Sequence, residues 1–492
     1  MSATVILIII IVYFLFLFTI SWYTSRKADQ TAYFIGNRVS PWYAVAFGLI
    51  GDSLSGVTFV SVPGAVEATQ FSYMQIVFGY VLGYVVIAQV LLPLYYRMNL
   101  TSIYTYLGER LGLASQKTGS FYFILSRLIG AAFRLYISAM VLQLFIFDAW
   151  GVSFAVTVTI IIILILLYTY KGGIKTLVWT DTMQSSFLLL GVIFSIVAIS
   201  NAMDLNFTGI VTTVRNSEYA RIFFWDWHEK NFFFKQFFSG ALIAIVMTGL
   251  DQNMMQKNLS IRTLPEAQKN IRWFSVVLVF VNLFFVALGA LLFEYAKAQQ
   301  IAIPEHTDQL FPLLALEHLG MFAAIVFVLG ITAATFSSAD SVLTTLTTSF
   351  YIDILGKSTE AEHESKSNRT TRHIIHIAFA ILLLAVIIVF QRINNDTVIN
   401  AVFTVAGYTY GPLLGLFAFG ILTKRNVRDR WVPFACLLPP VLSYFLNAHS
   451  VEWLNGYKFG YELLLMNGII TFVLLYLLSI NKSTYHERKI HT

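Results

Sequence analysis

Cysteine and charged residues are both scarce in this sequence. Cys436 is the only cysteine among 492 residues, which excludes an intramolecular disulfide and a cluster of thiolates around a metal. Charged residues make up 12% of the chain, about half the fraction usual in soluble proteins, while 57% of the residues are hydrophobic. The formal charge of +6 comes from basic residues in short segments between apolar runs, so nucleic acid is not expected as a partner. The composition predicts one polytopic membrane body rather than several soluble domains.

Apolar runs long enough to cross a bilayer recur along the whole chain. A helix needs about 20 mainly apolar residues to span the hydrocarbon core. We expect about thirteen such spans, near residues 3–23, 41–67, 71–96, 118–146, 152–170, 177–201, 233–256, 271–297, 319–354, 372–391, 397–422, 431–447 and 460–480. The first run lacks the basic start and the small-residue cleavage site of a secretory signal, and we interpret it as a retained span. The predicted fold class is therefore an all-α polytopic membrane protein.

Lysine and arginine concentrate in alternate loops. Arg26, Arg38, Arg110, Lys257 and Arg428 fall in these loops, and the loops between them are poorer in basic residues. Loops rich in Lys and Arg usually face the cytoplasm. We therefore expect a multi-pass protein of the plasma (inner) membrane, surrounded by lipid, with its N-terminus outside and its C-terminus in the cytoplasm.

The second predicted span contains residues that interrupt a helix. Residues 48–56 read GLIGDSLSG, with three glycines, two serines and an acid at mid-membrane depth. Such a segment unwinds easily, and irregular backbone at this depth is tolerated only where it is buried in protein or lines a cavity. Pro63 is expected to end or kink the half-helix that follows. A kink without a ligand is the alternative, but Asp52 favours function because an acid is costly in a membrane.

A second polar segment, residues 331–349, reads ITAATFSSADSVLTTLTTS. If this segment is helical, one side of it carries Ala334, Ser337, Ser338 and Ser341. Hydroxyls, the carboxylate of Asp340 and freed backbone carbonyls would form the all-oxygen environment that a hard cation requires. The alternative is that these small residues only allow helices to pack closely in lipid. Asp340 favours the ion site.

Two further acids lie near predicted span ends. Asp181 begins the sixth span within WTDTMQ, residues 179–184, where it could cap a helix terminus as readily as bind a ligand. Asp251 closes the seventh span within DQNMMQK, residues 251–257, and we assign it a helix-end role near the cytoplasm.

Arg127 and Arg134 lie seven residues apart in the fourth span and therefore share a face. They could pair with acids such as Asp52 or Asp340, or bind an anionic group of a substrate. Structural pairing is the favoured role of Arg127, whereas both roles remain open for Arg134.

A series of motifs then carries a family resemblance. In order they are YFIGNR (33–38), SLSGVTFVSVPG (53–64), TSIYTYL (101–107), YKGGI (170–174), WTD (179–181), DQNMMQKNLS (251–260) and ATFSSADS (334–341). In this order the chain resembles, nearly end to end, the sodium:solute symporter family of proline, sialic acid, galactose and sodium–glucose transporters. The resemblance implies the leucine-transporter fold, with inverted five-helix repeats at 41–201 and 233–424. Residues 202–232 would form an extracellular loop, 1–40 a peripheral first helix and loop, and 425–492 two peripheral helices and a short cytoplasmic tail.

The same resemblance implies ligands for sodium. A shared site would use the carbonyls of Gly51, Leu54 and Ala334 with the hydroxyls of Ser337 and Ser338. In some members a second sodium binds the acid that matches Asp181 together with hydroxyls near Ser337 and Ser341. Asp340 stands where the sialic acid transporters have a serine, and its carboxylate would hold that ion more strongly or bind a proton instead. The sialic acid transporters bind the substrate carboxylate with an arginine where this chain has Gly130, and Arg134 lies one turn further on.

The predicted function is secondary active transport, with sodium-coupled symport of a small organic solute into the cell by alternating access. The solute could be a sugar, a carboxylate or an amino-acid-like molecule, contacted by Asp52, Ser55, Thr58, Phe78 and Arg134. Na⁺ is the expected coupling ion, and no catalytic residue, prosthetic cofactor or obligatory protein partner is expected. The alternatives are a proton-coupled carrier of the same fold and, less favoured, an intramembrane enzyme. For the enzyme we find no intramembrane HExxH motif and expect no histidine within a span core that could serve Ser337.

Overall fold

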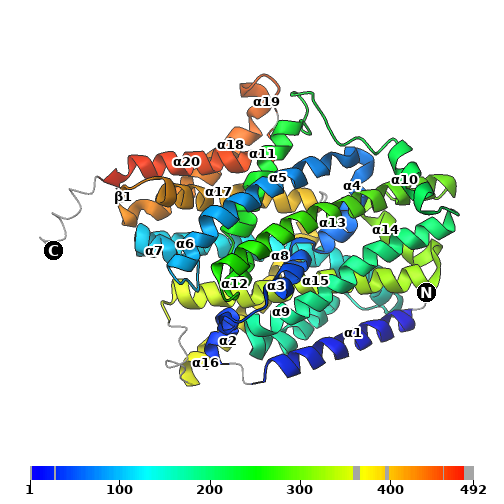
Figure 1. The fold of residues 1–492 in the computed structure, drawn as a ribbon, viewed down its shortest axis with the longest axis horizontal. Coiled ribbons are helices and arrows are strands. Elements are labelled where there is room, and N and C mark those ends of the chain that lie inside the picture. Colours follow the sequence, from blue (N-terminus) through cyan, green and yellow to red (C-terminus); the bar gives the residue numbers. More distant parts are fainter. Residues whose placement is uncertain (1–2, 27–28, 358–365, 394–397, 458, 481–492) are drawn as a thin grey trace, which may run out of the picture.

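A computed structural model describes residues 3–26, 29–357, 366–393, 398–457 and 459–480, most of them in helices (Figure 1). In the first half of the chain the helices are α1 (Ala3–Thr24), α2 (Gln30–Ile35), α3 (Trp42–Ser53), α4 (Gly56–Thr69), α5 (Tyr73–Val86), α6 (Leu92–Arg97), α7 (Thr105–Arg110), α8 (Leu113–Leu142), α9 (Phe154–Ala202), α10 (Phe207–Asn216) and α11 (Phe233–Ala244). The second half contains α12 (Gln252–Leu259), α13 (Leu264–Ala298), α14 (Leu310–Leu313), α15 (Gly320–Ser349), α16 (Lys366–Ile393), α17 (Val398–Leu422), α18 (Val432–Ala448), α19 (Ser450–Trp453) and α20 (Leu463–Leu477). Two short strands, β1 (Asn426–Val427) and β2 (Ser479–Ile480), pair antiparallel.

Among the described residues, nine helices are long and apolar enough to cross a membrane, and the bent pair of α11 and α12 would make a tenth. Two shorter apolar helices, Phe154–Thr169 and Leu463–Leu477, fall below that length. The prediction of a helical, membrane-spanning protein is confirmed. The count of thirteen stays a prediction, because breaks and kinks divide or merge several of the expected spans.

The helices lie roughly along one direction, with α1 along one edge of the body and α20 along the opposite edge (Figure 1). The start of α1 and α10 lie at the same end, and α7 and β1 lie at the other (Figure 1). The serine-rich helix α15 packs against α8 and α9 in the interior, and every residue from Gly330 to Ser349 is buried. Small side chains permit this close packing between helices, so a helix rich in hydroxyl groups is also one of the most enclosed of the described helices.

The second predicted span is broken, as expected from its glycines and serines. Helix α3 ends at Ser53, Leu54 has non-helical angles (φ −100°, ψ 77°), and α4 begins again at Gly56. Pro63 does not end the following half-helix, because α4 continues through it to Thr69.

A second break separates α11 from α12, which meet at an angle of 62°. The bend frees the carbonyls of Gly249 and Leu250, which accept hydrogen bonds from the hydroxyls of Tyr95 (2.8 Å) and Tyr104 (2.9 Å). These tyrosines satisfy backbone groups that could not remain unpaired at membrane depth.

The fifth and sixth predicted spans follow each other within α9, where two helices meet at a sharp kink at Gly173 (φ 50°, ψ −141°). A Cβ at this position would lie 2.4 Å from the carbonyl oxygen of Tyr33, so the kink requires glycine. Asp181 lies about two turns beyond this kink, inside the second of the two helices and not at a terminus, so the capping interpretation of this residue is wrong.

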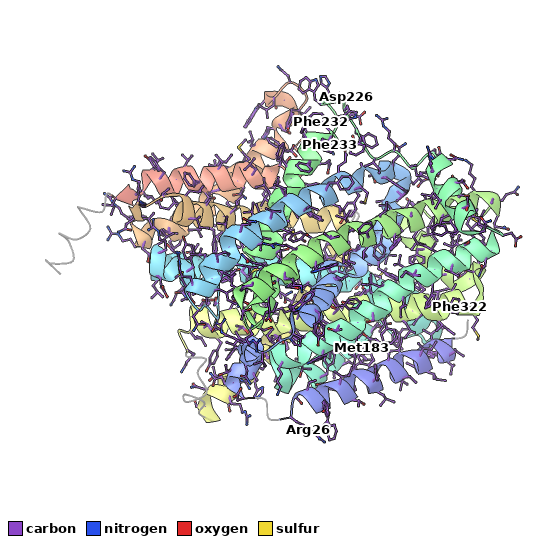
Figure 2. All side chains as sticks on the ribbon, in the orientation of Figure 1. Arg26, Met183, Asp226, Phe232, Phe233 and Phe322 are labelled. Carbon is purple, nitrogen blue, oxygen red and sulfur yellow. The ribbon has the colours of Figure 1, made fainter. Side chains whose placement is uncertain are left out.

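Residues 202–232 connect α9 to α11 across one edge of the body. The segment contains α10 and is held by the Phe71 N–H, which donates to the carbonyl of Arg221 (3.1 Å). Asp226 and Phe233 lie together where this segment enters α11, whereas Arg26 lies at the opposite edge (Figure 2). Of the predicted charged linker 355–371, residues 358–365 lie outside the described part of the chain.

Candidate functional site

A cavity lies where the two broken spans meet. It contains about 740 Å³ of empty space, including the part open to solvent. Its lining comes from the break between α3 and α4, from α5, α8 and α13, and from the bend between α11 and α12. Four of the five predicted substrate residues line it, namely Asp52, Ser55, Thr58 and Arg134.

Phe78, the fifth, does not line this cavity and instead stacks on Phe223, with 6.3 Å between ring centroids. The aromatic residues of α5 that do line it are Tyr73, Tyr80 and Tyr84. These three recur at helical spacing on one face of α5, a pattern that was legible in the sequence.

Arg127 and Arg134 have different surroundings. The Arg127 guanidinium donates to Asp251 Oδ2 (2.5 Å), which also accepts from the hydroxyl of Tyr410 (2.6 Å). Structural pairing of Arg127 was therefore the right expectation, but its bonded partner is Asp251 and not Asp52 or Asp340. Asp251 does occupy a helix end, because its other oxygen accepts from the N–H of Met254 at the start of α12 (3.2 Å).

The side chain of Arg134 is half-buried and makes no hydrogen bond or ion pair within the described residues. A guanidinium offers five donors in a fixed fork that matches a carboxylate. Arg134 is thus a cation in the cavity wall whose donors are available to a ligand.

The predicted sodium ligands converge from α3 and α15. A Cβ added to Gly51 would lie 3.0 Å from Ser337 Oγ, so the broken span and the serine-rich helix are in contact. Ser337 Oγ is buried without a hydrogen-bond partner in the described structure. No hydrogen bond to the carbonyl oxygens of Gly51 or Leu54 is present in that part of the chain either. Ser338 Oγ donates to the carbonyl of Ala334 (3.2 Å).

These oxygens have the chemistry that a hard cation needs. Buried oxygen atoms without partners are costly, and at the other break the freed carbonyls are satisfied by tyrosine hydroxyls. A small cation beside Gly51 and Ser337 would supply the missing interactions. The residues present therefore fit the sodium site that the resemblance implies.

The residues expected to form a second sodium site surround an amino group instead. Lys257 Nζ is bonded to a carboxylate oxygen of Asp52 and to one of Asp181, and it donates to Ser341 Oγ (2.7 Å). All of these side chains are almost completely buried. Asp340 lies beside them, with Oδ2 accepting from the hydroxyl of Tyr168 (2.8 Å) and Oδ1 from the N–H of Ser341 (2.6 Å).

Lys257 was missed at the level of sequence, where it was counted among the basic residues of a cytoplasmic loop. The signal that could have found it is the composition of α12. All eight residues of this helix are buried although most are polar, which is expected only where polar side chains meet partners inside the protein.

Known proteins resemble this chain over most of its length. The profile of the sodium:solute symporter family matches residues 33–429. The sodium/sialic acid symporter NanT of Aliivibrio fischeri is 25% identical over 82% of this chain and 80% of its own length. Sodium-coupled monocarboxylate transporter 1 of Homo sapiens is also 25% identical, over 82% of this chain and 64% of its own.

Two solved structures share the fold. The substrate-bound outward-open state of a Na⁺-coupled sialic acid symporter superposes with a TM-score of 0.82 at 19% identity, over 96% of this chain and 97% of the other. Mhp1, a nucleobase-cation-symport-1 family transporter, gives 0.53 at 11% identity, over 91% and 94%. Both are transporters of the leucine-transporter fold. The predictions of a transporter rather than an enzyme and of Na⁺ as the coupling ion are confirmed, and the chain belongs to the sodium:solute symporter family.

Proposed function

We propose that this protein carries a small organic carboxylate into the cell together with sodium by alternating access, with the guanidinium of Arg134 binding the carboxylate. The observation that carries the proposal is the cavity arginine without a partner among the described residues. A buried or half-buried cation is costly unless it is paired, and an anionic solute would supply the missing partner.

The start of α4 adds to the attraction for an anion. Ser55 precedes this 14-residue helix, and both Ser55 and Thr58 line the cavity. The N-terminus of a helix carries partial positive charge and free N–H groups. The end of α3, on the other side of the break, presents free carbonyls and suits a cation. One interruption in the backbone thus supports both an anionic solute and sodium.

Asp52 has a different role in this proposal from the direct substrate contact expected of it. Its side chain is held by Lys257, so it would orient that lysine while Ser55, Thr58 and Arg134 contact the solute. Two relatives act on acids according to their names, a sialic acid and a monocarboxylate, which supports a carboxylate here. A neutral sugar would leave the charge of Arg134 without a partner.

The sodium would bind to the carbonyls of Gly51, Leu54 and Ala334 and to the hydroxyls of Ser337 and Ser338. Moving one charge through about 100 mV is worth about 2.3 kcal/mol, and a tenfold sodium gradient adds about 1.4 kcal/mol. The sum of about 3.7 kcal/mol for each ion would support several-hundred-fold accumulation of the solute.

The arrangement in the membrane is part of the proposal. It comprises thirteen spans, inverted repeats at 41–201 and 233–424, an outside N-terminus and a cytoplasmic C-terminus. The position of α10 at the same end of the body as the start of α1 supports it (Figure 1), because residues 202–232 would then lie outside.

The test is uptake into proteoliposomes that contain the purified protein. Labelled monocarboxylates, a sialic acid, a neutral hexose and an amine would be offered with an inward sodium gradient, with an inward proton gradient, or with neither. We expect sodium-driven uptake of at least one carboxylate. Arg134→Gln should weaken its apparent affinity by about 10- to 150-fold, since hydrogen bonds to a charged group contribute about 1.5–3 kcal/mol.

Arg221→Gln is the matched control, because it removes an arginine that does not line this cavity, and it should leave uptake unchanged. Uptake driven by protons and indifferent to sodium would instead establish the proton-coupled carrier. Sodium-driven uptake of the hexose alone, unaffected by Arg134→Gln, would refute the carboxylate assignment.

A further inference from the structure

The side chain of Lys257 is almost completely enclosed where four helices meet. It projects from α12 and joins Asp52 of α3, Asp181 of α9 and Ser341 of α15. The exposed fraction of its side chain is 1%, and those of the two carboxylates are 1% or less. The ammonium group has three donors, and these three oxygen partners use all of them.

Two of these three partners, Asp181 and Ser341, belong to the set in which the resemblance places a second sodium ion. We propose that the ammonium of Lys257 replaces that ion, so that this protein binds one sodium and carries one sodium with each solute. This inference rests on the proposed function and adds the ion stoichiometry to it.

The exclusion is both steric and electrostatic. The Lys257 amino group already occupies the point on which a carboxylate oxygen of Asp181 and the hydroxyl of Ser341 converge. A sodium ion bound to the same oxygens would lie within a few ångströms of the ammonium, in surroundings where water does not screen the repulsion between like charges.

Asp340 does not provide a second sodium site apart from the oxygens that surround Lys257. Both of its oxygens are engaged, one by the hydroxyl of Tyr168 and the other by the N–H of Ser341. These bonds hold Asp340 within the hydrogen-bonded cluster, next to the oxygens that Lys257 already occupies.

The ammonium of Lys257 does not occupy the oxygens proposed for the first sodium site. Ser337 lies one helical turn before Ser341 on α15, and its hydroxyl has no hydrogen-bond partner among the described residues. The cluster holds more acids than bases, which favours a further cation close by at the Gly51 and Ser337 oxygens.

The test measures sodium directly. Equilibrium binding of ²²Na⁺ to the purified protein gives the number of ions bound to each chain, and the flux ratio of ²²Na⁺ to labelled carboxylate in proteoliposomes gives the number carried. We expect one ion in both measurements and a Hill coefficient near one for sodium. Two bound ions in the unaltered protein would overturn the inference, whereas no sodium binding at all would overturn the proposed function itself.

Lys257→Met removes the charge and keeps most of the side-chain volume. It should raise the number of bound sodium ions from one to two and steepen the sodium dependence, because Asp52 and Asp181 then lack a counter-cation. Lys257→Arg is the control that keeps the charge, and it should still bind one ion. A Lys257→Met variant that folds and binds only one ion would refute the role given to the ammonium.

Asp181→Asn is an independent test, which remains informative even if the Lys257→Met variant does not fold. Since Asp181 is assigned to Lys257 and not to sodium, the variant should still bind one ²²Na⁺. Loss of that single ion would mean that Asp181 is itself a sodium ligand, which would overturn the proposal.

Discussion

Replacing Ser337 by alanine tests whether the hydroxyl of this residue binds sodium or only contributes to the packing of α15. Ser337 Oγ is buried and makes no hydrogen bond in the described structure, and it faces the position that a Cβ on Gly51 would occupy, 3.0 Å away. If it binds the ion, its loss resembles the loss of a hydrogen bond to a charged group, which is worth about 1.5–3 kcal/mol. At about 1.4 kcal/mol for each factor of ten, the sodium affinity should fall by about 10- to 150-fold.

The same substitution should cost nothing when sodium is absent. It removes a buried polar atom that has no partner in the described structure, so the free energy of unfolding in sodium-free buffer should be unchanged or slightly higher. Thermal unfolding of the purified protein across a sodium titration reports both quantities, because a ligand that binds only the folded state raises the melting temperature with its concentration.

Thr335→Val is the matched control on the same helix. Thr335 Oγ1 donates to the carbonyl of Ile331 (2.6 Å) and is therefore occupied by its own helix. This variant should keep the sodium affinity of the unaltered protein. A Ser337→Ala variant whose affinity stays within about twofold of the unaltered protein would refute the assignment of Ser337 as a ligand.

Further substitutions test the packing and the charges of the site, each by thermal or denaturant unfolding with and without sodium. Gly51→Ala places a Cβ 2.5 Å from Ser185 Oγ and should weaken sodium binding, whereas Gly130→Ala meets nothing within 4 Å and should be neutral or stabilising by up to about 1 kcal/mol. Arg127→Met leaves Asp251 buried without its cation and should destabilise by about 3–5 kcal/mol, while Arg127→Met with Asp251→Leu should recover much of that loss. Lys297→Ala breaks only an exposed pair with Glu218 (3.5 Å) and should change stability by less than about 0.5 kcal/mol.

The parts of the fold that sequence predicted were those imposed by the membrane. Apolar length gives the spans, because a bilayer requires long apolar helices, and the glycines and serines of residues 48–56 gave the position of the break between α3 and α4. The bend between α11 and α12 was missed, because the tyrosines that satisfy Gly249 and Leu250 lie about 150 residues earlier in the chain. The pairing of β1 with β2 likewise depends on two segments that are distant in sequence.

Within the site, sequence reasoning identified which residues are unusual but not which residue each one meets. Asp52, Asp181 and Arg127 attracted attention because charge is costly in a membrane. Their partners, Lys257 and Asp251, follow the second break and resembled the start of a cytoplasmic loop. Only the 62° bend carries α12 back into the interior, and a bend of this kind leaves little trace in hydropathy.

Five residues at the break between α3 and α4 link every element of the proposed mechanism. Gly51 and Leu54 would offer carbonyls to sodium, Asp52 holds Lys257, and Ser55 lines the solute cavity at the start of α4. Backbone angles in so short a segment cannot change at one residue without displacing its neighbours, because the helices on both sides are regular. Binding of sodium to the carbonyls would therefore also fix the solute-binding serine, and binding of the solute would fix the carbonyls. Such coupling must be reciprocal, so we expect the carboxylate to raise the affinity for sodium by the same factor by which sodium raises the affinity for the carboxylate.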